Sequence, residues 1–280
     1  MLWRRLIAEF LGSGFLAALV IGSGIAAQRL SPGGTGLELL ENAAATAAGL
    51  FAIIVMFGPV SGGHFNPVVS FADAFFGGLR WRDAAAYLPA QVAGCVAGAV
   101  AANVMFARAA ISISAKHRMS GAHFLAEVIA TAGLVLVIFA LARTGRARSA
   151  PAAVGAYIGA AYWFTSSTSF ANPAITIGRM FSDSFAGIAP ASAPGFIAAQ
   201  VIGGAVAVGV VKVLYPGVTP GEAAEVVVPH PASAGQADGP GPRQGYPTEG
   251  DGAAPGPPGT PGDGLTGKGR IYASGRGRRQ

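Results

Sequence analysis

The sequence predicts an all-α membrane protein with six transmembrane helices and two re-entrant half-helices, arranged as an inverted repeat. Of the 280 residues, 52% are hydrophobic and only 11% are charged, about half the usual charged share. Six apolar stretches each approach the roughly 20 residues that a bilayer requires. Two Asn-Pro pairs, at residues 66–67 and 172–173, follow the second and fifth stretches.

The six expected spans cover residues 5–27, 40–59, 83–106, 121–142, 150–168 and 192–214. Basic residues at their ends are unequally divided between the two sides. One side holds Arg4, Arg5, Arg80, Arg82, Arg143, Arg146, Arg148 and Lys212, and the other holds Arg29, Arg108, Lys116 and Arg118. Because cytoplasmic loops carry the excess of Lys and Arg, both termini are predicted to be cytoplasmic.

Each Asn-Pro pair predicts the start of a short helix. Asn is a strong N-cap, and Pro is favoured at the first helical position. The first half-helix is expected over 67–76, ending at Gly77-Gly78, and the second over 173–182. Ten residues span about 15 Å, half of a hydrocarbon core of about 30 Å. Two such helices are therefore expected to meet at the membrane midplane.

Motifs recur between the two halves of the chain. The pairs are Ala8-Glu9-Phe10 with Ala126-Glu127-Val128, Asn66-Pro67 with Asn172-Pro173, and Ala90-Gln91-Val92 with Ala199-Gln200-Val201, at offsets of 118, 106 and 109. The halves, about 1–106 and 118–214, form one predicted channel domain over 1–215. With three spans in each half, the second half enters from the opposite face, as in many solute-conducting proteins.

Composition also limits the remaining possibilities. Residues 216–280 are rich in Gly and Pro, which predicts a disordered tail. The net charge of +6 is spread over helix ends and this tail, so no nucleic acid is expected as a partner. Cys95 is the only cysteine, which excludes an intrachain disulfide. No set of nucleophile and base or of metal ligands is evident, so neither an enzyme nor a cofactor is expected.

The twin boxes, Asn66-Pro67-Val68 and Asn172-Pro173-Ala174, resemble those of the aquaporin and aquaglyceroporin family of major intrinsic proteins. The resemblance covers residues 1–215. It implies a passive channel for water and small uncharged solutes such as glycerol, urea or metalloid hydroxides. It also implies a homotetramer with one pore per subunit, located in the cell membrane, and it places both boxes at the pore centre.

The two asparagines have a predictable role at such a centre. As N-caps, their side-chain oxygens accept bonds from their own half-helices, which leaves each NH₂ group as a donor. Water at this point must accept from the Asn pair, so a proton wire along the file of water is interrupted. The positive ends of the helix dipoles also repel cations.

Glu9 and Glu127 are ionisable groups inside spans, and such groups normally face a partner or water. Broken helices leave backbone N–H groups that need acceptors, and the family resemblance assigns both glutamates to this task. Pairing with Arg5 is an alternative for Glu9. His64 matches the His-x-Asn-Pro pattern of the family, which implies that it lines the cytoplasmic half of the pore. The alternative is a buried histidine with satisfied hydrogen bonds.

The outer filter departs from the usual pattern of the family, which has Arg directly after the second box. Here that residue is Ile175. Counting back from each Asn gives Thr46, Ala160 and Ser169 as the other members. This ring has small side chains and no fixed charge, so a wider outer pore than in strict water channels is expected. Val68 in the first box is a mild change on the apolar wall.

Arg179 follows Ile175 by one helical turn. It lies four residues from Ile175 and four from Asp183. Two interpretations are open, projection toward the outer mouth or an ion pair with Asp183 at the i,i+4 spacing. The ion pair is the favoured interpretation.

Two other classes of membrane protein fit parts of the pattern. An inverted-repeat secondary transporter of a small neutral solute needs a coupling-ion site, for which the spans offer only Glu9 and Glu127. A structural membrane protein would keep the boxes without conducting. Solute flux that does not saturate favours the channel, and dependence on an ion gradient favours the transporter.

Overall fold

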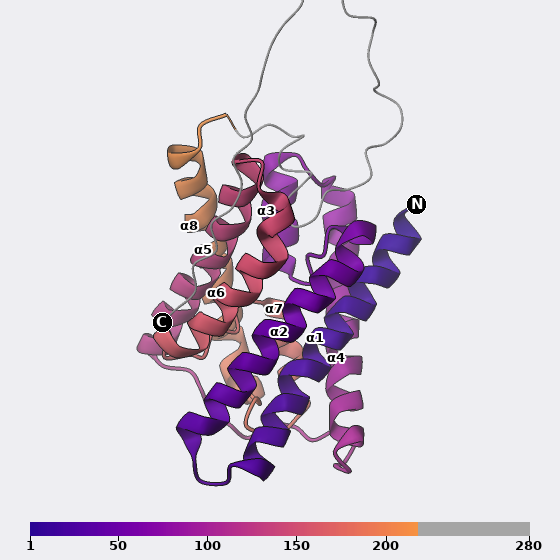
Figure 1. Ribbon diagram of the computed structural model, residues 1–280, viewed down its shortest axis with the longest axis vertical. Coiled ribbons are helices and arrows are strands. Elements are labelled where there is room, and N and C mark those ends of the chain that lie inside the picture. Colours follow the sequence, from indigo (N-terminus) through magenta and orange to yellow (C-terminus); the bar gives the residue numbers. More distant parts are fainter. Residues whose placement is uncertain (218–280) are drawn as a thin grey trace, which may run out of the picture. The chain divides into compact units, whose positions relative to one another are not determined.

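The computed structural model describes residues 1–217, and residues 218–280 lie outside the described part. Over residues 1–217 the chain is helical, with no strand (Figure 1). The helices are α1 (Leu2–Leu30), α2 (Thr35–Ser61), α3 (Pro67–Phe76), α4 (Trp81–Met105), α5 (Gly121–Arg143), η1 (Ala147–Ser149), α6 (Ala150–Phe164), α7 (Pro173–Arg179), η2 (Pro190–Ser192) and α8 (Ala193–Leu214). This confirms the predicted all-α fold class.

Five helical segments within residues 1–217 are long and apolar enough to cross a membrane: α1, α2, α4, α5 and α8 with its preceding η2 turn. The fifth span in chain order, α6, is shorter, with 15 residues. It ends at Phe164 and not at residue 168 as predicted. Thr168 and Ser169 have φ angles of 62° and 48°, which a right-handed helix excludes. The chain therefore leaves the helix early and turns back as a loop.

The first half-helix has the predicted bounds. The Asn66 side chain caps α3 by accepting from the Val68 backbone N–H at 3.0 Å. Gly77 ends it in the left-handed conformation, with a φ of 87°. That conformation carries little steric cost for Gly, which is why the Gly-Gly pair stops the helix here.

The second half-helix is shorter than predicted. Asn172 caps α7 through bonds from the N–H groups of Ala174 at 2.9 Å and Ile175 at 3.3 Å. The helix ends at Arg179, three residues before the predicted end at 182. Beyond Arg179 the bonds tighten to i→i+3, as in the 3.1 Å bond from Met180 N–H to the Ile177 carbonyl. The chain then turns away from the helix axis.

The two halves pack in the same way. Helix α1 lies against α4 in the first half, and α5 lies against α8 in the second. Helices α2 and α6, one from each half, contact each other (Figure 1). A Cβ atom on Gly94 would lie 2.2 Å from the Phe10 carbonyl oxygen, and one on Gly203 would lie 2.5 Å from that of Val128. These residues are related by the sequence offsets of 109 and 118. Close helix contact through small residues is therefore part of the repeat.

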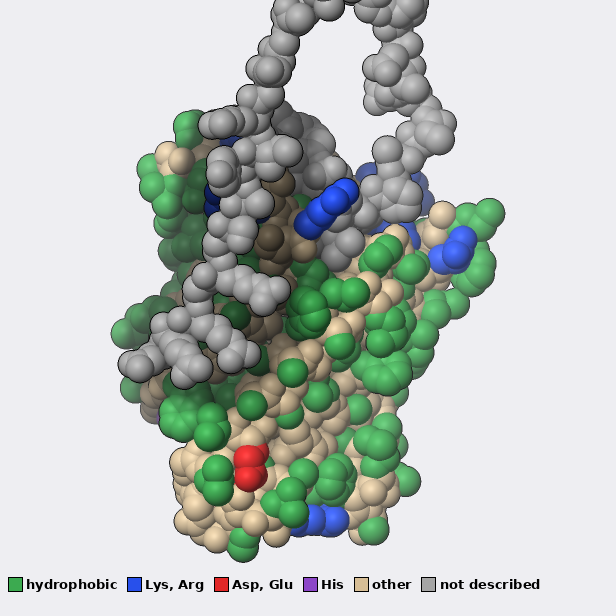
Figure 2. All heavy atoms as spheres, in the orientation of Figure 1, with side chains coloured by type: hydrophobic (Ala, Val, Ile, Leu, Met, Phe, Trp, Pro, Cys, Tyr) green, Lys and Arg blue, Asp and Glu red, His purple; other side chains and the backbone are tan. Residues whose placement is uncertain are grey.

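Charged side chains mark the two ends of the bundle. On the face shown in Figure 2 they lie near the ends of the helices, with hydrophobic side chains between them. Arg5 contacts Asp83 at 3.6 Å, which joins the start of α1 to the start of α4. At the other end, Arg29 donates to the carbonyl of Phe106, just beyond α4. Basic residues of the two predicted sides thus lie at opposite ends of these helices.

The predicted tail over 216–280 lies almost wholly outside the described residues, so its interpretation stays a prediction. We expect that truncation after Gly217 leaves assembly and conduction unchanged, because no apolar pattern in the tail predicts docking on the spans. Gel filtration and solute flux of the truncated chain test this. A truncated chain that fails to assemble, or that conducts at less than half the full-length rate, contradicts it.

Candidate pore

A narrow cavity of about 60 Å³ runs between the ends of the two half-helices. This volume accommodates a short file of water molecules. One wall is aliphatic and comes from α1, α2, α5 and α6. Its residues are Leu16, Val20, Leu50, Ile54, Leu134, Ile138, Val154 and Ile158. The opposite wall comes from the two loops that precede the half-helices, residues 63–66 and 169–172, and from Val69, Ile175 and Arg179 of the half-helices themselves.

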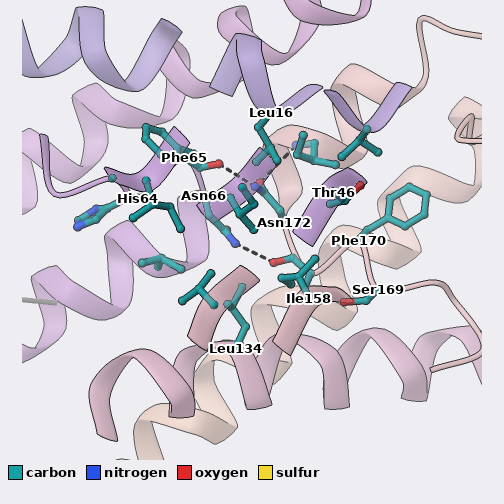
Figure 3. Close-up of a pocket in the computed structure, with 18 of the residues that line it drawn as sticks. Leu16, Thr46, His64, Phe65, Asn66, Leu134, Ile158, Ser169, Phe170 and Asn172 are labelled. Carbon is teal, nitrogen blue, oxygen red and sulfur yellow. Dashed lines mark hydrogen bonds between the residues drawn. The ribbon is translucent and has the colours of Figure 1, made fainter. Parts of the chain in front are cut away.

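The two asparagines meet at the centre of this cavity (Figure 3). The Asn66 Nδ2 donates to the Ala171 carbonyl at 2.8 Å, and the Asn172 Nδ2 donates to the Phe65 carbonyl at 2.7 Å. Phe65 and Ala171 have φ angles of 46° and 49°, and this left-handed turn directs each carbonyl to the opposite half. The sequence predicted two available hydrogens per amide. The reciprocal bonds use one, which leaves one on each Asn for a passing molecule.

The remaining box residues lie inside the half-helices and outside the cavity. Pro67, Pro173 and Ala174 are buried. Val68 is also buried but faces α8, where a Cβ on Gly204 would lie 2.3 Å from the Val68 Cγ1. The prediction that Val68 alters the pore wall is therefore wrong. The Val68 side chain, larger than that of alanine, fits here because Gly204 on α8 has no side chain.

Glu9 is fully buried and supports the first loop. Its carboxylate accepts from the backbone N–H groups of His64 at 3.1 Å and Phe65 at 2.7 Å. It also accepts from the Ser61 hydroxyl at 2.6 Å and the Gln91 amide at 2.8 Å. Loop N–H groups without a helical partner thus have an acceptor, and the buried charge has four donors. Arg5, the alternative partner, contacts Asp83.

Glu127 supports the second loop in the same manner. It accepts from the N–H groups of Phe170 and Ala171, each at 2.9 Å, and from the Gln200 amide at 2.7 Å. The same amide reaches the Thr176 hydroxyl at 2.9 Å. This hydroxyl bonds the carbonyl of Asn172 at 2.9 Å.

The first half repeats this chain of bonds with Gln91 and Ser70. The Gln91 amide reaches the Ser70 hydroxyl at 3.0 Å, and this hydroxyl bonds the Asn66 carbonyl at 3.1 Å. Sequence reasoning did not assign a role to either glutamine. Their place in the repeat, at an offset of 109, was the available signal.

His64 reaches the cavity through its main chain only. The residue is 5% exposed overall, while its side chain is 0% exposed. The imidazole points away from the asparagines (Figure 3). Its Nδ1 lies 3.1 Å from the Ser70 hydroxyl, and its Nε2 lies 3.3 Å from the Asp73 carboxylate. The main chain of His64 therefore lines the cavity while its ring is buried, and its role in conduction stays a prediction.

Thr46, Ser169 and Ile175 line the outer part of the cavity as the sequence predicted, but Ala160 does not. Ala160 is exposed on another face of α6. Ile158 and Tyr162, two residues to either side, line the cavity instead. Two residues correspond to about 200° around a helix, so a small error in register moves a side chain to the opposite face. The Tyr162 hydroxyl lies 3.2 Å from that of Thr46.

Arg179 lines the cavity and is 2% exposed. Its guanidinium carbon lies 3.4 Å from the centroid of the Phe170 ring, and its Nε donates to the Ala186 carbonyl. The predicted ring without a fixed charge is therefore wrong. Stacking of a guanidinium on an aromatic face is a favourable arrangement.

The favoured ion pair between Arg179 and Asp183 does not form. The Asp183 carboxylate accepts from the Ala115 N–H at 3.2 Å, and the Asp183 carbonyl accepts from Arg108 at 2.8 Å. The i,i+4 argument requires a helix through residue 183, whereas α7 ends at Arg179. Asp183 therefore lies beyond the helix, next to Arg108 and Ala115 of the segment between α4 and α5.

Two capped half-helices that meet inside a six-helix inverted repeat, around a narrow cavity, define a membrane channel. The sequence profile of the major intrinsic protein family matches residues 1–171. The aquaglyceroporin AqpS of Rhizobium meliloti (strain 1021) is 46% identical over 211 residues, which cover 75% of this chain and 90% of that protein. The chain therefore belongs to the major intrinsic protein family.

Further relatives agree with this assignment. The lens fiber major intrinsic protein of Gallus gallus is 33% identical over 146 residues, which cover 49% of this chain and 53% of that protein. Among solved structures, the aquaglyceroporin from Plasmodium falciparum superposes with a TM-score of 0.60 at 21% identity. That match covers 78% of this chain and 99% of the other, and it supports the shared fold.

Proposed function

We propose that this chain is a passive channel that conducts water and small uncharged solutes such as glycerol, through the cavity between α3 and α7. The observation that carries the proposal is the pair of asparagines, each with one N–H left for a solute. The similarity to a protein named as an aquaglyceroporin supports solutes of the glycerol type.

The cavity walls fit this function. The aliphatic wall offers no hydrogen bonds, so along this wall a passing molecule bonds only to the loops opposite and to its neighbours in the file. At the centre, Asn66 and Asn172 donate and so orient the oxygen of a water or hydroxyl group. That oxygen then cannot accept from the next water, and the proton wire is interrupted. Each hydrogen bond that the solute loses as it advances is replaced by a new one, and this keeps the barrier to neutral solutes low.

We assign the outer filter to Thr46, Tyr162, Ser169, Ile175 and Arg179. Tyr162 is much larger than the alanine that the sequence placed in this ring, which supports a narrower mouth than first predicted. Arg179 supplies guanidinium donors and a positive charge, the two features that Ile175 lacks. A positively charged mouth supports the exclusion of cations and the passage of neutral hydroxylated solutes.

Stopped-flow light scattering on proteoliposomes tests the function. Under gradients of water, glycerol and urea, a channel gives a low activation energy and a rate that does not saturate at moderate solute. A secondary transporter of a neutral solute, the alternative function, saturates and responds to an ion gradient. Flux no faster than through empty liposomes would contradict both functions and favour a structural role.

The assembly and location of the chain belong to the same proposal. Membership of the family supports a homotetramer with one pore per subunit, in the cell membrane. The excess of basic residues at the end that carries the N-terminus supports cytoplasmic termini. Cross-linking in liposomes and protease access to each terminus in intact cells test these assignments.

Ile175→Arg is expected to lower glycerol and urea flux about tenfold and water flux less. Ile175 lines the same cavity as Thr46 and Arg179, so a second guanidinium narrows the mouth and adds repulsion. A loss of tenfold corresponds to about 1.4 kcal/mol in the barrier. The measured quantity is the ratio of solute to water permeability. Ile175→Val is the matched control, and an unchanged ratio in Ile175→Arg places residue 175 outside the filter.

A further inference from the structure

The sequence repeat extends to a charged residue and a ring beside each Asn. The seventh residue after each Asn is Asp73 in the first half and Arg179 in the second, at an offset of 106. The second residue before each Asn is His64 or Phe170, at the same offset. The Asp73 carboxylate lies 3.3 Å from the His64 Nε2, and the Arg179 guanidinium lies 3.4 Å from the centroid of the Phe170 ring. Each half-helix thus holds a loop ring with a charged side chain.

Asp73 depends on His64 as its partner. The carboxylate is fully buried, and within residues 1–217 the His64 imidazole is the basic group within 4.0 Å of it. A buried carboxylate without a partner is costly. Neither the His64 Nε2 nor the Asp73 carboxylate has a hydrogen-bond partner elsewhere within residues 1–217, so each depends on the other, at 3.3 Å.

Groups from three helices surround His64. On α3, Ser70 lies at the Nδ1. On α4, the Tyr87 ring lies edge to face with the imidazole, with centroids 5.6 Å apart. On α1, Glu9 accepts from the His64 backbone N–H, and the Arg5 guanidinium lies 5.3 Å from the centroid of the Tyr87 ring. These contacts enclose the ring on the side away from the cavity.

We propose that Asp73 is a positioning residue that keeps the His64 imidazole out of the conduction path. This inference rests on the proposed channel function. With the ring held by Asp73, the half of the cavity next to residues 63–66 is lined by main chain and aliphatic side chains. Among the described residues, that half then presents no ionisable side chain to a passing molecule.

Loss of Asp73 removes the partner of Nε2. The imidazole then gains hydrogen bonds by turning toward water in the cavity, because a polar group left unpaired in the interior is costly. A ring in the pore narrows it. The exposed ring also gains a positive charge as the pH falls below the ordinary histidine pKa of about 6.5. Conduction then depends on pH.

The test compares water flux of the wild type, Asp73→Leu, and the double variant His64→Phe/Asp73→Leu between pH 5.5 and 8.0. The wild type is expected to show the same flux across this range. Asp73→Leu is expected to lose flux several-fold, with a pH dependence centred at about 6.5. In the double variant Phe replaces the ring as at position 170, and flux is expected to return without pH dependence.

A purely structural role for Asp73 would lower flux equally at every pH and leave the double variant equally impaired. That result, or wild-type behaviour of Asp73→Leu, overturns the proposal.

A second measurement does not require that Asp73→Leu folds. Diethyl pyrocarbonate modifies accessible imidazoles, and it is expected to leave wild-type flux unchanged. Block of the wild type but not of the double variant also overturns the proposal, whereas absence of wild-type flux would refute the channel function itself.

Discussion

Asn66→Asp and Asn172→Asp are each expected to lower water flux about tenfold or more and to open a cation leak. In each variant an oxygen replaces the Nδ2 that now lies 2.8 Å or 2.7 Å from the opposite loop carbonyl. Two acceptors then face each other, at a cost of about 1–3 kcal/mol. Added to the barrier for conduction, this cost corresponds to a factor of about 5–160 in rate. The carboxylate also attracts cations to the pore centre.

Stopped-flow shrinkage gives the flux, and a pH-sensitive dye inside the liposomes reports the leak. Asn103→Asp is the matched control, because the Asn103 amide also donates to loop carbonyls, of Ala110 and Phe181, away from the cavity. We expect it to lower stability without a leak. Normal, proton-tight conduction by both box variants would show that the asparagines do not act as the central filter.

The sequence predicts those features of the pore that depend on local chemistry. Asn followed by Pro predicts a capped helix start, and both caps form as predicted. An acid inside a span predicts a partner, and Glu9 and Glu127 each bind a loop. Both arguments need only the neighbouring residues and the repeat, because the bonds connect equivalent places in the two halves.

Features that depend on register or on long-range contacts were missed. Ala160 was placed by counting residues across a loop with three left-handed residues, and the count failed by two positions. The expected ion pair of Arg179 assumed that α7 continued to Asp183. The buried ring of His64 depends on Asp73, nine residues away, and spacing alone does not bring the two together.

One signal for these missed contacts was nevertheless present in the chain. The offset of 106 that relates the two boxes also relates Asp73 to Arg179 and His64 to Phe170. The residues change in charge and ring type between the halves, so similarity of residue type does not reveal the relation. Position in the repeat was therefore a better guide to contact than residue identity.

Arg179→Ala is expected to open the outer mouth, with a several-fold rise in the ratio of glycerol or urea flux to water flux and a measurable cation leak. Arg179 lines the cavity and is 2% exposed, and the pair with Asp183 that would have neutralised it does not form. At an effective dielectric constant of about 20, a cation about 4 Å away is repelled by about 4 kcal/mol. Alanine removes this repulsion and much of the side-chain volume.

Arg118→Ala is the matched control for this prediction. Its guanidinium also lies over Phe170, at 5.4 Å, and it donates to the carbonyls of Gly187 and Phe185 at 2.7 Å. Arg118 is not among the residues that line the cavity, so its loss should loosen the loop at Phe185 and Gly187 without changing the solute ratio. Arg179→Lys keeps the charge and should stay cation-tight. If Arg179→Ala retains both the wild-type ratio and cation exclusion, the filter is set by Thr46 and Tyr162 through width alone.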